Sequence, residues 1–226
     1  MTVTVNGAAN TGASNDLIAI SHATKVVKGR TVLDDVSLEL PRGGIYGFAG
    51  VNGSGKTMLF RAVGGLIHLT SGSVSVFGQV IGRDADFPSD MGIVLGPSGF
   101  IDEKTGRKNL LALASIRGVI GPAEVDAALR RVGLDPDDAR PFSAYSLGMR
   151  QRLSIAQAVM ERPQLLVLNE PTNALDVDGI AMVVGLLAEE RERGATILVA
   201  SHNEPTLEAL CDRRYNMADG RVTGEG

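Results

Sequence analysis

Residues 50–57 form a glycine-rich loop with the pattern G-x-x-x-x-G-K-T. Its members are Gly50, Val51, Asn52, Gly53, Ser54, Gly55, Lys56 and Thr57. The apolar run 45–49 before it predicts a buried strand, and the apolar-periodic stretch 58–67 after it predicts a helix. A loop in this context folds around phosphate with its backbone N–H groups pointing inward. The pattern therefore predicts a phosphate-binding loop in an α/β fold.

Two side chains at the end of the loop suit a nucleotide. Lys56 can reach β- and γ-phosphates, and the Thr57 hydroxyl can ligate Mg²⁺. The N-terminus of the following helix adds partial positive charge. A glycine-rich turn that binds nothing is the alternative, but the lysine, the threonine and both flanking segments favour phosphate binding.

Composition limits the classes of partner. The net charge is −4, and a general affinity for nucleic acid favours an excess of Lys and Arg, so we expect no nucleic-acid partner. Cys211 is the only cysteine, which excludes an intrachain disulfide and suits the cytosol. No apolar run reaches membrane-spanning length, and the N-terminus lacks the pattern of a secretion signal. Any role at a membrane is therefore expected to be that of a peripheral subunit.

The order of segments indicates how the chain is organised. Residues 1–16 are small and polar and are predicted to be a disordered tail, while residues 17–226 are predicted to be one domain. Strands alternate with helices in the second half, which favours a parallel core, and residues 97–148 are expected to be a helical insertion into it. The individual segments are strands at 17–27, 31–40, 72–81, 165–168 and 196–200 and a helix at 179–193.

Four further features follow the loop in the sequence. Ser146 opens a helix as a good N-cap, and the N–H groups of that first turn, with Leu147 and Gly148, offer a second anion site. Glu170 ends the apolar strand 165–168, at the edge where α/β proteins bind ligands, so its carboxylate can polarise a water. Asp176 lies just beyond, and His202 follows the strand 196–200, where it can reach a γ-phosphate.

Together these motifs resemble the nucleotide-binding subunits of ABC transporters over residues 17–226. Residues 50–57 match the Walker A motif, Ser146–Arg152 match the signature in its S-L-G-M-x-Q-R form, and Leu165–Glu170 match Walker B. Ala174–Asp176 are similar to the D-loop and His202 to the switch histidine. The signature, with Thr105–Leu110 and Glu170–Asp176, is similar to the subfamily of antibiotic and bacteriocin export or self-immunity transporters.

The resemblance implies a P-loop ATPase of ABC type, with a mixed-sheet core and a helical subdomain. It implies a head-to-tail dimer, either homodimer or heterodimer, with each ATP between the Walker A loop of one subunit and the Ser146–Gly148 turn of the other. It also implies a separate membrane-spanning permease at the inner face of the cell membrane. Residues 96–100 and the helical insertion are expected to contact that permease.

Three positions depart from the family pattern. Val27 stands where an aromatic residue usually stacks on adenine, and offers only an apolar contact. Gly96 replaces the Gln or Glu that follows the strand at 91–95. Asn169 replaces the Walker B aspartate that supports Mg²⁺, so the metal site is left with Thr57, Asn169, phosphate oxygens and water.

These departures leave two main hypotheses. In the first, the chain is a working ATPase with a weakened metal site, because Lys56, Glu170 and His202 are all present. In the second, it binds ATP but hydrolyses little, and lends its signature turn to a competent partner subunit. A soluble iron–sulfur assembly ATPase is a third interpretation, which the exporter-like signature disfavours.

Overall fold

The computed structural model describes residues 16–96, 99–202 and 204–225. The predicted disordered tail thus lies outside the described residues, apart from Asp16. Residues 97–98 of the expected permease-contacting loop also lie outside them.

Four strands form an antiparallel sheet in the order β2-β1-β4-β5. They are β1 (Asp16–Val27), β2 (Arg30–Pro41), β4 (Ser71–Val76) and β5 (Gln79–Val80). The tight turn between β1 and β2 is made by Lys28 and Gly29, whose φ angles are 49° and 79°. The single strand expected at 72–81 is wrong, because Phe77 and Gly78 adopt φ angles of 54° and 79° and turn the chain back between β4 and β5.

Six strands form the second sheet in the order β10-β9-β3-β8-β7-β6. They are β3 (Ile45–Ala49), β6 (Met91–Val94), β7 (Leu165–Asn169), β8 (Thr196–Ser201), β9 (Arg213–Ala218) and β10 (Arg221–Glu225). All neighbouring pairs are parallel except β9 with β10. The expected mixed-sheet core is therefore confirmed, and its central strands are the continuous apolar runs that parallel sheets require.

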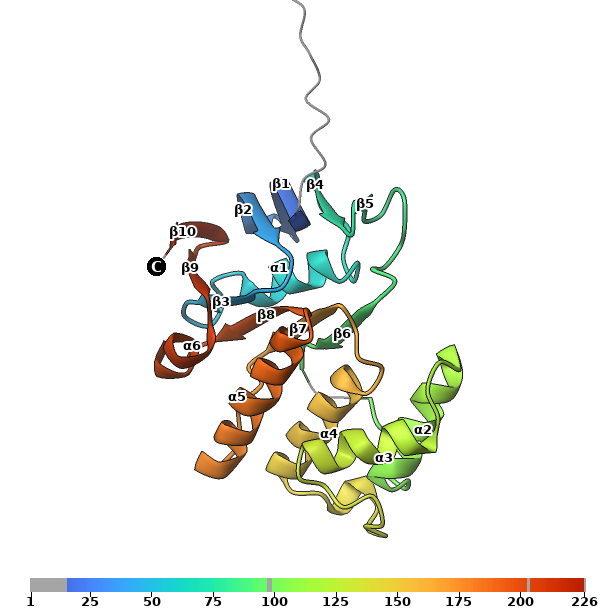
Figure 1. Cartoon of the computed structure of the whole chain (residues 1–226). Helices are drawn as coiled ribbons and strands as arrows, with labels where there is room; N and C mark the ends of the chain where they lie inside the picture. The colour runs from blue at the N-terminus through green and yellow to red at the C-terminus, as the bar shows by residue number, and fades with distance from the viewer. Residues whose placement is uncertain (1–15, 97–98, 203, 226) are drawn as a thin grey trace, which may run out of the picture.

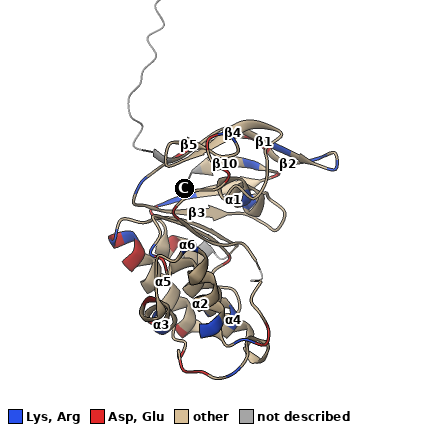
Figure 2. Cartoon of the chain, turned by 90° about the vertical axis from the view of Figure 1, so that its right-hand side faces the viewer, with Lys and Arg blue, Asp and Glu red and all other residues tan. Residues whose placement is uncertain are grey.

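Apolar side chains of the central strands alternate between two cores. Leu165 and Val167 of β7 pack into the core shared with α1 (Lys56–Val63) and the antiparallel sheet, whereas Leu166 and Leu168 pack into the core shared with the lower helices. Because successive residues of a strand point to opposite faces, one strand serves both cores. Figures 1 and 2 show the resulting layers: antiparallel sheet, α1, six-stranded sheet, and then the helices α2 to α5.

Most helices lie on the far side of the six-stranded sheet from α1 (Figure 1). Between β6 and β7 the chain forms α2 (Gly106–Arg117), α3 (Pro122–Arg131), the short 3₁₀ helix η1 (Phe142–Ala144) and α4 (Leu147–Val159). Two helices follow, α5 (Val177–Glu192) and α6 (Glu204–Leu210). The boundaries 97–148 of a separate subdomain stay a prediction.

The helix expected at 58–67 is shorter at its C-terminal end than predicted, because α1 ends at Val63. Gly64 caps it, and Gly65 adopts a left-handed φ of 73°, which ends the helical hydrogen bonding. Within the described ranges, every helix falls short of the length and apolar character that crossing a bilayer requires. Figure 2 shows basic and acidic residues in both the sheet part and the helical part of the molecule.

Candidate nucleotide site

The loop 50–57 connects β3 to α1 and depends on its glycines. Gly50, Gly53 and Gly55 have φ angles of 148°, 86° and 109°, a region that side-chain-bearing residues rarely adopt. A Cβ at Gly50 would lie 2.3 Å from the Met217 carbonyl oxygen, so the loop packs directly on the end of β9. The backbone of the loop therefore depends on glycine at these positions, as a phosphate-binding loop does.

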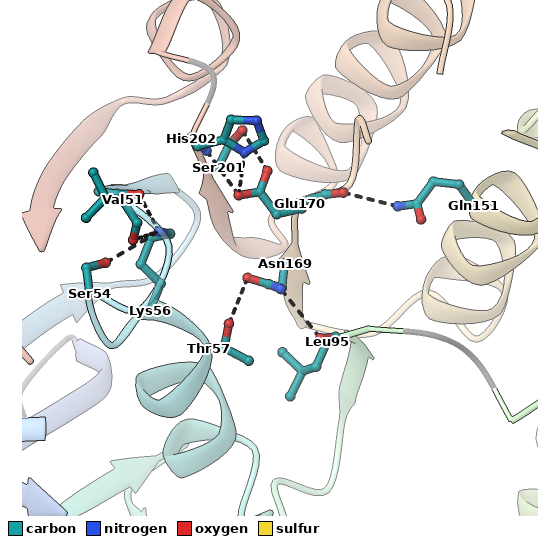
Figure 3. A network of polar contacts seen from close by, with 11 residues as sticks. Val51, Ser54, Lys56, Thr57, Leu95, Gln151, Asn169, Glu170, Ser201 and His202 are labelled. Carbon is teal, nitrogen blue, oxygen red and sulfur yellow. Dashed lines mark hydrogen bonds and ion pairs between the residues drawn. The ribbon is translucent and has the colours of Figure 1, made fainter. Parts of the chain in front are cut away.

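Lys56 lies at the first position of α1 and reaches back over the loop. Its Nζ donates to the carbonyl oxygens of Gly50 and Val51, the latter at 3.1 Å, as Figure 3 shows. Burial lowers the pKa of this ammonium, and the nearby Glu170 carboxylate raises it in part. A poorly hydrated cation at a helix N-terminus is well placed to pair with a phosphate group.

A cavity of about 390 Å³ opens over the loop. It is lined by Arg30, Thr31, Val32, Asn52, Gly53, Ser54, Gly55, Lys56, Thr57, Met58, Asn169, Glu170, Asp219 and Gly220. Residues 52–57 of Walker A and Asn169 and Glu170 of Walker B therefore meet at one cavity, although more than a hundred residues separate Thr57 from Asn169 in the sequence.

Val27, the predicted adenine contact, does not line this cavity. It ends β1 with 39% of its surface exposed, and the turn at Lys28 and Gly29 brings Arg30 and Thr31 to the cavity instead. Sequence reasoning also missed Asp219 and Gly220. Their Asp-Gly pair signals a hairpin turn, but only the parallel pairing of β9 with β3 brings that turn beside the loop.

Asn169 joins two elements by its side-chain amide. Its Oδ1 accepts a hydrogen bond from Thr57 Oγ1 at 3.4 Å, and its Nδ2 donates to the Leu95 carbonyl oxygen at 3.4 Å (Figure 3). An aspartate has no N–H and could not make the second contact. Asn169 therefore ties the phosphate loop to the residue that precedes Gly96.

The oxygens near Thr57 fit Mg²⁺ only as weak, neutral donors. The Thr57 hydroxyl and the Asn169 amide oxygen face each other, and the described part of the chain contains no group of three or more His, Cys, Asp or Glu side chains arranged to hold a metal. Mg²⁺ commonly keeps several waters and takes phosphate oxygens as ligands. Two neutral protein oxygens are therefore chemically suitable to complete its coordination.

Glu170 and His202 are in direct contact. The Glu170 carboxylate accepts hydrogen bonds from His202 Nδ1 at 2.9 Å, from the His202 backbone N–H at 3.1 Å and from Ser201 Oγ at 3.2 Å. Two of the predicted catalytic residues thus form one unit at the C-terminal edges of neighbouring strands β7 and β8. Ser201, the last residue of β8, belongs to this unit, and no role was predicted for it although it directly precedes His202.

Among the predicted site residues, Val27 and seven others are outside the cavity lining: Gly50, Val51, Ser146, Leu147, Gly148, Asp176 and His202. Ser146 caps α4 by accepting from the Met149 N–H at 3.2 Å, as its sequence context predicts, and Leu147 beside it is 73% exposed. Asp176 caps α5 by accepting from the Gly179 N–H at 2.9 Å. Within one chain, Ser146, Leu147, Gly148 and Asp176 do not join the residues that line the cavity.

Comparisons with known proteins agree with the motifs. The family described as ABC transporter matches residues 33–173. The uncharacterized ABC transporter ATP-binding protein YybJ of Bacillus subtilis (strain 168) is 40% identical over 206 residues, which cover 91% of this chain and 94% of that protein. The bacitracin transport ATP-binding protein BcrA of Enterococcus faecalis is 37% identical, and the match covers 92% of this chain and 68% of that protein. The lantibiotic transport ATP-binding protein SrtF of Streptococcus pyogenes is 33% identical, and the match covers 91% of this chain and 89% of that protein.

Solved structures share the fold. The structure of an ATP-binding subunit of an ABC transporter matches with a TM-score of 0.82 at 25% identity, covering 93% of this chain and 89% of that chain. The dimeric structure of the bacterial ABC transporter cassette MJ0796 matches with a TM-score of 0.83 at 23% identity, covering 92% and 97%. The family predicted from the motifs is confirmed: the chain belongs to the ABC transporters, as one of their ATP-binding subunits.

Proposed function

We propose that this chain hydrolyses ATP and uses the reaction to drive a separate membrane permease, as the motor of an exporter. The observation that carries the proposal is the joint presence, at one cavity, of the phosphate loop and a carboxylate held by His202. Hydrolysis needs both a site for the phosphates and a group that orients the attacking water.

Each residue has a distinct role in this proposal. The N–H groups of residues 50–57 and the Lys56 ammonium hold the β- and γ-phosphates. Glu170 orients a water and accepts its proton, and His202 both fixes that carboxylate and contacts the γ-phosphate. Thr57 and Asn169 would hold Mg²⁺, directly or through water, and the metal would neutralise phosphate charge.

The proposal includes a dimer. In the signature turn, Ser146 and Leu147 are exposed and Gly148 is half-buried, and none of the three lines the cavity of its own chain, so we assign their N–H groups to a phosphate held by another subunit. The dimeric structure of the MJ0796 cassette, which has the same fold, is consistent with this arrangement. Pairing with an identical chain and pairing with a different ATPase subunit are both compatible with it.

Relatives suggest the kind of transport. BcrA is a bacitracin transport ATP-binding protein, and SrtF is a lantibiotic transport ATP-binding protein. We therefore propose that the transported substrate is an antibiotic-like peptide. The permease would span the membrane, and this subunit would lie peripherally on its cytoplasmic face. The segment 96–100 and the helices α2 and α3 would form the contact with the permease.

Turnover against Mg²⁺ concentration tests hydrolysis. Purified chain is assayed for phosphate release, with Glu170→Gln as the variant expected to lose it. Gly96→Glu is assayed in parallel, because a Cβ at Gly96 would meet nothing within 4 Å and the substitution should fold. Magnesium-dependent release by the unchanged chain, lost in Glu170→Gln, supports the proposal.

The neutral metal site favours one alternative, a subunit that binds ATP but scarcely hydrolyses it. Asn169 and Gly96 remove two of the usual supports of the metal. Tight ATP binding without turnover at saturating Mg²⁺, in the unchanged chain and in Gly96→Glu, would establish this alternative and overturn the proposal.

A further inference from the structure

One face of α4 contacts the loop that carries Glu170. Gly148, Gln151 and Arg152 are spaced i, i+3 and i+4 and therefore share a side of the helix. A Cβ at Gly148 would lie 3.0 Å from the Ala174 carbonyl oxygen, and Arg152 lies 3.7 Å from the Asp176 carboxylate. The segment 170–176 is thus held by the first two turns of the helix that begins at the signature turn.

Gln151 makes the hydrogen bonds of this contact that are nearest to the catalytic carboxylate. Its Nε2 donates to the Pro171 carbonyl oxygen at 3.0 Å and to the Glu170 carbonyl oxygen at 3.3 Å. Figure 3 shows the Gln151 side chain pointing from α4 straight at the backbone of Glu170. Arg150 of the same helix turns elsewhere, donating to the Ser143 and Tyr145 carbonyl oxygens.

The backbone that Gln151 holds is strained. Glu170 has a φ of 52°, in the left-handed region that costs a residue with a side chain about 1 kcal/mol or more. The Glu170 N–H donates to the Ala200 carbonyl oxygen, and its own carbonyl accepts from the Asn173 N–H and from Gln151. Such a conformation persists only where neighbours enforce it, and Gln151 is the neighbour from the helical part.

We propose that Gln151 is a positioning residue for hydrolysis, which holds Glu170 in the left-handed conformation that directs its carboxylate to His202 and the cavity. The inference rests on the proposed hydrolysis by Glu170. It assigns to Gln151 an effect on the chemical step and none on nucleotide binding, because among the described residues its side chain hydrogen-bonds to the backbone of Glu170 and Pro171 and does not line the cavity.

The same contact links the two ATP sites of the proposed dimer. Ser146 begins α4 and meets the nucleotide of the other subunit, whereas Gln151, on the next turn, holds Glu170 of its own subunit. If α4 moves when the dimer closes, the Glu170 backbone therefore moves with it, because the Gln151 side chain connects the two.

The test compares Gln151→Leu with Gln157→Leu. Gln157 lies on the same helix, and no described hydrogen bond ties it to the segment 170–176. The control therefore makes the same Gln→Leu change in α4 without altering the contact with that segment. Gln151→Leu should lower kcat for ATP about tenfold to a hundredfold, as displaced catalytic groups do, with KM within about twofold. Gln157→Leu should match the unchanged chain in both constants.

A second comparison excludes a merely structural role. On the Glu170→Gln background, Gln151→Leu should leave the residual turnover and the ATP-dependent dimer unchanged, because Gln151 acts only through Glu170. Equal kcat for Gln151→Leu and Gln157→Leu, or a further loss on the Glu170→Gln background, would overturn the inference while leaving the proposed function intact. Absence of turnover by the unchanged chain would overturn both.

Discussion

At the scale of single residues, the proposed function makes Asn169 the residue that would set how strongly the site binds Mg²⁺. A negative charge restored about 5 Å from Mg²⁺ adds roughly 2–7 kcal/mol of attraction for effective dielectrics of 80 to 20. The opposing term is the lost hydrogen bond to the Leu95 carbonyl oxygen, worth about 1 kcal/mol. Asn169→Asp should therefore lower the Mg²⁺ concentration that half-saturates ATP turnover, by at least about fivefold.

A control separates local charge from net charge. Gln79→Glu adds the same charge on the exposed strand β5, in the antiparallel sheet and outside the lining of the cavity. It should leave the Mg²⁺ dependence of turnover unchanged. If Asn169→Asp and Gln79→Glu gave the same curve, the metal would not be held beside Asn169.

Cys211 reports on local burial because it is the only cysteine of the chain. Burial, reinforced by the neighbouring Asp212 carboxylate, raises the pKa of its thiol from 9.0 to about 12. The thiolate is the reactive form, so alkylation by iodoacetamide at pH 8 should be about a thousandfold slower in the folded chain than for an ordinary thiol. Intact-mass measurements over time check this.

The unfolded chain supplies the comparison for Cys211. In guanidinium chloride the thiol regains its ordinary pKa and should be modified at the rate of a free cysteine. A folded chain that reacted as fast as the unfolded one would show that α6 and β3 do not shield this thiol as the structure describes.

At the scale of elements, a buried carboxylate joins the helices α3 and α5. Glu190 of α5 is 2% exposed, and it pairs with Arg131 of α3 at 2.7 Å and with Arg193. Glu189, next to it, pairs with the same Arg131 at 2.9 Å, but its side chain is 66% exposed. The two adjacent glutamates therefore share a partner and differ in burial.

This difference predicts unequal effects on stability. Glu190→Gln leaves two partly buried guanidinium groups without their shared carboxylate and should lower the free energy of unfolding by roughly 3–5 kcal/mol. Glu189→Gln breaks an exposed pair and should cost about 0–1 kcal/mol. Urea unfolding monitored by circular dichroism measures both, and equal losses would show that α3 is not tied to α5 through Glu190.

The elements themselves were predictable where one local rule decides them. The apolar runs that became β3, β7 and β8 were identified because a parallel strand buried on both faces needs no polar residue. The split of the expected strand 72–81 was missed, because Phe77 adopts a left-handed φ of 54° that its residue type does not signal. Local sequence predicts burial better than it predicts such turns.

The site was predictable to the extent that its residues lie in contiguous motifs. Lys56, Thr57, Asn169 and Glu170 were found because each follows a strand or opens a helix, and the structure brings them to one cavity. Asp219 was missed, because its place at the cavity depends on the pairing of β9 with β3, two strands distant in the sequence. The contact of Gln151 with Glu170 is likewise tertiary, and no spacing rule announces it.

At the scale of the whole molecule, the exposed signature turn predicts an ATP-dependent dimer. Leu147 is 73% exposed and lies directly beside Ser146 at the start of α4. In the slowly hydrolysing Glu170→Gln variant, ATP should convert monomer to dimer in analytical ultracentrifugation. Adding Leu147→Asp to that variant should keep it monomeric, because a charge at the contact must be desolvated.

A second exposed apolar residue serves as the control for this prediction. Ile116 of α2 is 78% exposed and lies outside the signature turn, so Ile116→Asp on the Glu170→Gln background should dimerise normally with ATP. Both double variants should bind ATP as monomers with similar affinity, since neither position lines the cavity. Dimerisation that survived Leu147→Asp, or that was lost equally with Ile116→Asp, would show that the two subunits do not meet through the signature turn.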